Sequence, residues 1–200
     1  MQRALILPLF AFGVLAACAT TSARQQCRAP RQAGELAQLA RVADSAGTAI
    51  SLSVDTMAVI PRRFLHGVVA RLSVIEQCGG VRSPEQLRDA AATALAARTL
   101  GAPTVERAYT WARAAVVADS ADRRNWRVMA QSWDHLQVLQ RQPQWFATVV
   151  SCASPILGRC SLAPLDSTRV TEALRVEFGL PTLQQQRVRV DSLNRVRGQP

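Results

Sequence analysis

Residues 122–151 read DRRNWRVMAQSWDHLQVLQRQPQWFATVVS, and this stretch decides the fold class. Asp122 suits the N-cap of a helix, and Pro143 blocks the continuation of that helix. The residue pattern then changes, because Trp145 to Ser151 is rich in strand-forming residues and Cys160 to Leu165 can pair back with it. The stretch therefore predicts a helix that is followed by a small β-hairpin.

Helical patterns dominate the chain before this stretch. Pro61 opens a segment with apolar residues on one face, namely Phe64, Val68, Leu72 and Ile75. Ser83-Pro84-Glu85-Gln86 is typical of a capped helix start, and Gly101 is expected to end that helix. Ile50 to Val54 alternates apolar and polar residues, which fits either a short strand or continued helix.

Together these patterns predict a mainly α fold. It is a helical bundle with one small β-hairpin near the C-terminus, followed by two short helices, of which the first starts at Asp166 or Ser167. The helices are expected at about residues 35–46, 61–77, 83–100, 104–118, 122–141, 166–179 and 183–197.

The basic side chains argue against a nucleic-acid partner. All 24 of them are Arg, and the formal net charge is +10. A nucleic-acid-binding protein gathers its charge on one face or arm. Past the targeting segment, the Arg residues of this chain are spread from Arg24 to Arg197. We therefore expect no nucleic-acid partner, and a weak attraction to anionic lipid head groups fits the charge better.

The N-terminus is typical of an export signal. Met1-Gln2-Arg3 precedes an apolar run, Ala4 to Ala17, that is too short to span a bilayer comfortably. The run leads into Leu15-Ala16-Ala17-Cys18, which closely resembles the lipobox of bacterial lipoproteins: a branched apolar residue, two small residues and a Cys that takes the lipid. The resemblance implies lipidation of Cys18; the alternative is an ordinary cleaved signal in which this Cys is incidental.

This resemblance implies a domain organisation and a location. Residues 1–17 form the lipoprotein signal peptide, residues 18–31 a flexible tether, and residues 32–200 a single mostly helical domain with its hairpin at about 145–165. Ala19 and Thr20 follow Cys18 where inner-membrane lipoproteins tend to carry Asp, which implies the outer membrane, facing the periplasm. The expected partners are the membrane, through the N-terminal lipid, and an envelope protein.

The other four cysteines suggest disulfides, as expected of an exported chain. Three pairings are open to them, and proximity favours Cys152 with Cys160, which leaves Cys27 with Cys78. The alternative is a metal site, but the chain has no CxxC-type pair and only His66 and His135 as further ligands. We therefore expect neither a metal nor another cofactor.

Few residues suggest catalysis. No nucleophile elbow, phosphate-binding loop or zinc-protease motif is present. Asp134 and His135 are adjacent, and neighbours on a helix point about 100° apart, so they cannot face each other as a dyad. Glu172 and Glu177 sit five apart on one helix and are expected to form a solvated face.

A stripe of large residues on the central helix has two readings. It comprises Trp126, Met129, Ala130 and Trp133, which recur at helical spacing. The functional reading is a stacking platform for a sugar or a peptide. Core packing is the simpler one and is favoured, because burial alone readily produces such stripes.

Asp134 to Leu183 resembles the C-terminal part of a bacterial family called domain of unknown function 6624. The matching positions are Asp134, Pro143-Gln144, Pro164-Leu165-Asp166, Arg175, Gly179-Leu180-Pro181 and Leu183. Where the family carries Tyr-Gly-Thr-Gln, this chain has Phe146, Ala147, Thr148 and Val149, so any chemistry of that Tyr or Gln is lost. The resemblance implies the helix-hairpin-helix architecture and makes Asp134, Gln144 and Thr148 the candidate polar residues.

Two functions remain open. The first is a non-catalytic envelope lipoprotein that binds another protein or supports an assembly; the second is a periplasmic enzyme acting on cell-envelope material. A pocket joining Asp134, Gln144 and Thr148 would favour the enzyme. We expect a fold role for Gln144 and Thr148, because a buried Gln must find backbone partners or lose about 1–3 kcal/mol.

Overall fold

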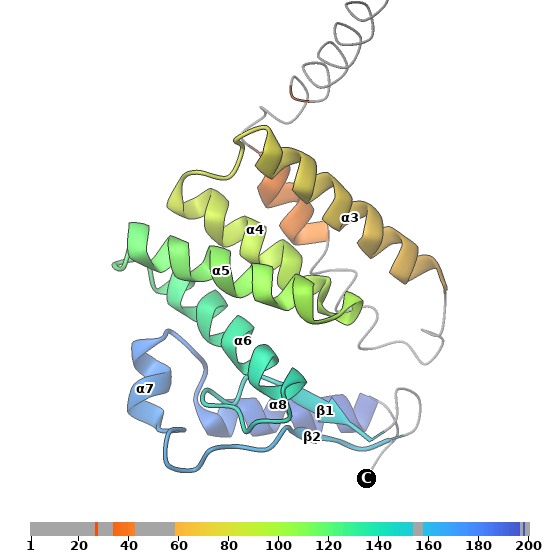
Figure 1. Cartoon of the computed structure of the whole chain (residues 1–200). Helices are drawn as coiled ribbons and strands as arrows, with labels where there is room; N and C mark the ends of the chain where they lie inside the picture. The colour runs from red at the N-terminus through yellow and green to blue at the C-terminus, as the bar shows by residue number, and fades with distance from the viewer. Residues whose placement is uncertain (1–26, 28–33, 43–58, 154–157, 197, 199–200) are drawn as a thin grey trace, which may run out of the picture.

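The computed structural model describes residues 27, 34–42, 59–153, 158–196 and 198 (Figure 1). The signal peptide, the lipidation candidate Cys18 and the segment Ile50 to Val54 lie outside the described residues.

The chain is mainly helical with one small antiparallel hairpin, so the predicted fold class is confirmed. Residues 35–42 are helical, and they are followed by α3 (Val59–Gln77), α4 (Pro84–Ala96), a 3-10 turn (Arg98–Leu100), α5 (Ala102–Ala118) and α6 (Arg123–Leu139). The C-terminal part consists of β1 (Val150–Cys152), β2 (Cys160–Leu162), α7 (Glu172–Glu177) and α8 (Leu183–Val196). None of the described helices is long and apolar enough to cross a membrane.

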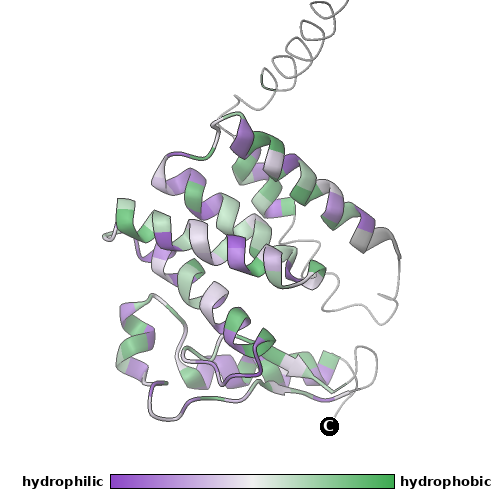
Figure 2. Ribbon diagram, viewed as in Figure 1, coloured by the Kyte–Doolittle hydropathy of each residue, from purple (hydrophilic) through white to green (hydrophobic). Residues whose placement is uncertain are grey.

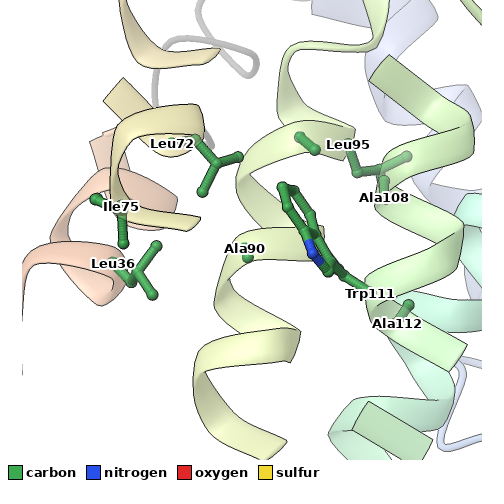
Figure 3. Close-up of a cluster of buried hydrophobic side chains, with 10 residues drawn as sticks. Leu36, Leu72, Ile75, Ala90, Leu95, Ala108, Trp111 and Ala112 are labelled. Atoms are coloured by element: carbon green, nitrogen blue, oxygen red, sulfur yellow. The ribbon is translucent and has the colours of Figure 1, made fainter. Parts of the chain in front are cut away.

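The core of the bundle lies between α3, α4 and α5 (Figure 3). Trp111 of α5 fills the space beside Leu95 of α4, and Leu72 and Ile75 of α3 close it from the other side. Several fully buried alanines, such as Ala90, let the helix backbones approach closely. Hydrophilic and hydrophobic residues alternate along these helices (Figure 2), as expected of helices with one buried face.

One predicted core residue of α3 was wrong. Phe64 is 41% exposed, whereas its neighbour Leu65 is 1% exposed and joins Val68, Leu72 and Ile75 in the core. The apolar spacing fits either residue, and the packing of α3 selects Leu65.

The predicted helix ends are largely those of the structure. Ser83 and Gln86 form the expected capping box at the start of α4, and Asp122 caps α6 by accepting the N–H of Arg124. The helix expected to reach Leu100 instead ends at Ala96 and continues as the 3-10 turn. Gly101, with φ +116°, then makes the break before α5.

The C-terminal part packs on α6, on the side of the molecule opposite α3 (Figure 1). In the hairpin, Ser151 pairs with Ser161, and α8 lies against β2. The predicted strand from Trp145 to Ser151 was wrong for residues 145–149, because β1 begins only at Val150. Those five residues form a loop, which we call the 145–149 loop.

The helix predicted to start at Asp166 or Ser167 begins later. Asp166 instead builds a turn, because its carboxylate accepts the N–H and the hydroxyl of Thr168. Thr171 then caps α7, which starts at Glu172. Local side-chain hydrogen bonding of this kind competes with helix formation.

Two pairs of cysteines lie at disulfide distance. The sulfur atoms of Cys152 and Cys160 are 2.04 Å apart, across directly paired positions of the hairpin. Those of Cys27 and Cys78 are 2.08 Å apart, which ties the N-terminal segment to the end of α3.

Candidate functional site

The three candidate polar residues do come together, and Asp134 is at their centre. Asp134 lies on α6 and is fully buried, facing the 145–149 loop. Its Oδ1 accepts the backbone N–H groups of Trp145 (2.8 Å) and Phe146 (3.0 Å), and its Oδ2 accepts the backbone N–H of Thr148 (2.9 Å). The Thr148 hydroxyl donates to the same Oδ2 at 2.8 Å. The carboxylate therefore organises the loop rather than facing solvent.

The loop can wrap Asp134 because of one unusual backbone conformation. Ala147 has φ +53°, in the left-handed region that non-glycine residues rarely occupy. This turn lets the N–H groups on both sides of Ala147 point at one carboxylate, an arrangement that favours anions. The methyl group of Ala147 is fully buried. A straight strand, as predicted for these residues, would point successive N–H groups in opposite directions.

Gln144 holds the base of the same loop. Its side chain is fully buried, its Nε2 donates to the carbonyls of Val149 (3.0 Å) and Ala163 (2.8 Å), and its Oε1 accepts the N–H of Val149 (2.8 Å). Its backbone also bonds to Pro164 and Asp166, which fixes the end of α6 to the chain beyond β2. The prediction that a buried Gln144 finds backbone partners is confirmed.

Arg175 of α7 completes this arrangement, and the search for catalytic candidates missed it. The side chain is 1% exposed. Its guanidinium donates from Nη1 to the carbonyl of Phe146 and from Nε to the carbonyl of Pro181 (2.8 Å). Nη2 has no hydrogen-bond partner among the described residues. The signal in the sequence was the place of Arg175 between the apolar residues Leu174 and Phe178, on the inward-facing side of a short amphipathic helix.

The electrostatics of the site reflect its burial. Burial raises the pKa of the Asp134 carboxyl above its ordinary value, and the hydrogen bonds from Thr148, Trp145 and Phe146 act against this rise. Burial likewise lowers the pKa of Arg175, against the influence of Glu172 and Asp134. All the groups that contact the Asp134 oxygens are donors, so the ionised carboxylate is the form that this geometry satisfies.

The other titratable candidates are not brought to Asp134. His135 is half-buried, and burial together with the positive charge of Arg98 lowers its pKa to about 3. Glu172 and Glu177 are both exposed, as expected, and Glu172 accepts the N–H of Leu183 at 2.8 Å. Within the part of the chain that the structure covers, no group of three or more His, Cys, Asp or Glu residues could hold a metal ion.

The aromatic stripe of α6 is core, as favoured from the sequence. Trp126 packs edge-on against Phe178 with ring centres 5.0 Å apart, and Trp133 lies 4.9 Å from Trp145. Met129 and Ala130 belong to the same cluster, which joins α6 to the C-terminal part. Ala130 is fully buried, and Trp126, Met129 and Trp133 are partly buried against this cluster, so the stripe serves packing.

The arrangement leaves little for catalysis. Both oxygens of Asp134 and both polar atoms of the Gln144 side chain are used by the backbone around them. A groove lies between the hairpin and α8, and none of the three candidate residues lines it. No family model matches the chain, and neither does any curated protein or solved structure. The resemblance to domain of unknown function 6624 therefore stays a prediction.

Proposed function

We propose that this chain is a lipid-anchored protein of the bacterial cell envelope whose folded domain is a non-catalytic interaction or structural module. One observation supports the non-catalytic role. Asp134 is the best candidate for chemistry, but its carboxylate oxygens accept backbone N–H groups of the 145–149 loop. A catalytic carboxylate needs a lone pair within reach of a substrate. Gln144 is committed in the same way, so the polar cluster builds the fold.

The anchoring half rests on Leu15-Ala16-Ala17-Cys18 and on the cysteine pairs. Disulfides persist in oxidising compartments, which fits a domain on the periplasmic side of a membrane. The outer membrane is the proposed location, because no Asp follows Cys18.

Intact-mass analysis of the protein purified from a double-membrane bacterium tests the anchor. The wild type should carry the mass of a diacylglycerol and fatty acid on Cys18, whereas Cys18→Ser should remain an unprocessed precursor or lack lipid. The same lipid-free species from both forms would contradict lipidation.

Crosslinking in the native envelope, followed by purification of the wild-type lipoprotein, tests the interaction role. We expect a defined protein partner that is also recovered with Thr148→Val, since Thr148 serves the loop. Turnover of purified cell-wall material that is lost in Thr148→Val, with the melting curve unchanged, would contradict a non-catalytic role.

A further inference from the structure

The groove between the hairpin and α8 is separate from the hydrogen-bond network of Asp134. Its volume is about 410 Å³, within the range of roughly 300–1,000 Å³ that ligand sites occupy. It is open to solvent, and its walls combine three apolar side chains with two basic ones and one acid: Leu162, Leu165, Val190, Arg159, Arg187 and Asp191.

The hydrogen bonds of the hairpin show which backbone groups face outward from β2. The strands are joined at two outer pairs, Ala163 N–H to Val149 O (3.0 Å) and Ala153 N–H to Arg159 O (3.1 Å). Ser151 and Ser161 pair midway between them. Bonded and non-bonded pairs alternate in an antiparallel ladder, so Cys160 and Leu162 turn their N–H and C=O groups away from β1.

Asn194 of α8 occupies the first of these two outward positions. Its Oδ1 accepts the N–H of Cys160 (2.7 Å) and its Nδ2 donates to the carbonyl of Cys160 (3.0 Å). The amide side chain thus bonds to β2 as a neighbouring strand would. Leu162, two residues on and lining the groove, has no such partner among the described residues. One rung of the strand edge therefore remains open to a peptide backbone.

The charge of the groove selects an acidic occupant. The guanidinium groups of Arg159 and Arg187 have no ion pair or hydrogen bond within the described part of the chain, and Asp191 is the one acid in the lining. Two cations beside an apolar floor suit a segment in which carboxylates alternate with apolar side chains.

The anchored end of the molecule argues against a lipid head group as the occupant. Eight residues lie between Cys18 and Cys27, which is bonded to Cys78 at the end of α3. The nine residue steps from Cys18 to Cys27 reach about 30 Å when fully extended, so a lipid on Cys18 keeps α3 near the membrane. The hairpin and α8 lie on the opposite side of the molecule, with α4, α5 and α6 between (Figure 1).

We propose that this groove binds an extended acidic peptide segment of an envelope protein, by backbone bonds to Leu162 and carboxylate contacts with Arg159 and Arg187. This rests on the proposed function, which supplies both the anchor and a protein partner. The site is the end of the domain presented away from the membrane.

Fluorescence anisotropy with a labelled peptide of four Leu-Glu repeats tests the site, using the lipidated protein in non-ionic detergent. Arg187→Gln should weaken binding about five- to tenfold. Arg189→Gln is the matched control, because Arg189 is exposed on the same helix and does not line the groove, and it should change affinity less than about twofold. The Leu-Gln peptide and an acidic peptide N-methylated at alternate residues should both bind weakly. Unchanged melting curves for both variants confirm that the fold is intact.

Three results would overturn the proposal. Equal losses with Arg187→Gln and Arg189→Gln would mean general charge attraction. Undiminished binding of the N-methylated peptide would exclude the strand edge. Capture of lipid-free Cys18→Ser protein by phosphatidylglycerol vesicles, lost in Arg187→Gln but not in Arg189→Gln, would make the occupant a lipid. Cleavage of the bound peptide would refute only the non-catalytic role, and absence of lipid on Cys18 would refute only the anchor.

Discussion

Asp134 and Arg175 both bind the backbone of Phe146: the carboxylate accepts the N–H of Phe146, and the guanidinium donates to the carbonyl of Phe146. No direct ion pair joins the two side chains in the described structure. The Asp134 carboxylate is instead satisfied by the 145–149 loop, and the Arg175 guanidinium donates from Nη1 and Nε to the carbonyls of Phe146 and Pro181. Because burying a charge without partners is costly, the loop and the two charges stabilise one another.

Gln144→Ala should lower the free energy of unfolding by about 2–4 kcal/mol. The change leaves the N–H of Val149 and the carbonyl of Ala163 without their side-chain partner, removes one of the two bonds to the Val149 carbonyl, and opens a cavity. For a domain of this size the melting temperature should fall by roughly 5–10 °C. Gln184→Ala, at an exposed position of α8, is the control and should melt with the wild type. Equal melting temperatures for all three proteins would show that Gln144 does not support the fold.

Substitutions of Ala147 by Val and by Gly should differ sharply in their effect on stability. Ala147→Val should lose about 3 kcal/mol or more, because a β-branched residue is strongly disfavoured at φ +53° and the site is fully buried. Ala147→Gly should stay within about 1 kcal/mol of the wild type, since relief of the left-handed strain offsets the lost methyl contacts. Urea denaturation of the two variants measures the difference. A Val variant as stable as the Gly variant would refute the left-handed conformation.

Local signals predicted much of the fold. Ser83 and Asp122 cap their helices as expected, because capping depends only on residues within one turn. The 145–149 loop was mistaken for a strand because its geometry depends on residues outside the loop. Phe146 and Val149 have high strand propensity, but Asp134, which is 12 residues before Phe146, binds the Phe146 backbone, and the Gln144 side chain binds the Val149 backbone.

The polar residues of the core were the hardest to predict. Gln144 was singled out by the resemblance to domain of unknown function 6624, and its place after Pro143 and before apolar residues suggested a role in the fold. Arg175 and Asn194 lie on the buried faces of α7 and α8, and their partners at Phe146 and Cys160 are 29 and 34 residues away. No local pattern links residues so far apart, so their roles emerge only from the packed structure.

Stability should fall as the pH drops from 7 to 4.5, and His135 should account for part of the fall. Burial and Arg98 lower the pKa of His135 to about 3 from an ordinary value of 6.5. Between these values the unfolded chain binds the proton and the folded protein does not, so acid favours unfolding. The loss should be on the order of 1–3 kcal/mol in the wild type and smaller in His135→Gln.

Urea denaturation at both pH values measures this effect, and comparing the two proteins cancels the other titrations. Asp122, with a pKa lowered to about 2, contributes stability that is lost only below about pH 3.8 and so falls outside the window. The same pH-dependent loss in His135→Gln as in the wild type would show that His135 is not the titrating group.

Peptide mapping under non-reducing conditions should recover Cys152 joined to Cys160 and Cys27 joined to Cys78. Cys152→Ser together with Cys160→Ser should then lower the free energy of unfolding by about 2.5 kcal/mol, because this bond closes a short loop. Removal of the Cys27–Cys78 bond, which closes a longer loop, should lower it by about 4 kcal/mol. Free thiols at all four positions, or exchange of partners between the pairs, would refute the pairing. The N-terminal segment would then not be tied to the end of α3.

The most direct test of the account is the free energy of unfolding of Asp134→Asn. Asn has the same shape, but its amide turns a donor toward the N–H and hydroxyl of Thr148. If Asp134 serves the fold, the variant should lose about 3 kcal/mol in urea denaturation, while Asp191→Asn on the exposed face of α8 should change stability by less than about 0.5 kcal/mol. An Asp134→Asn protein as stable as the wild type, or more stable, would contradict the account, because that is the behaviour of a carboxylate kept for chemistry at a cost in stability.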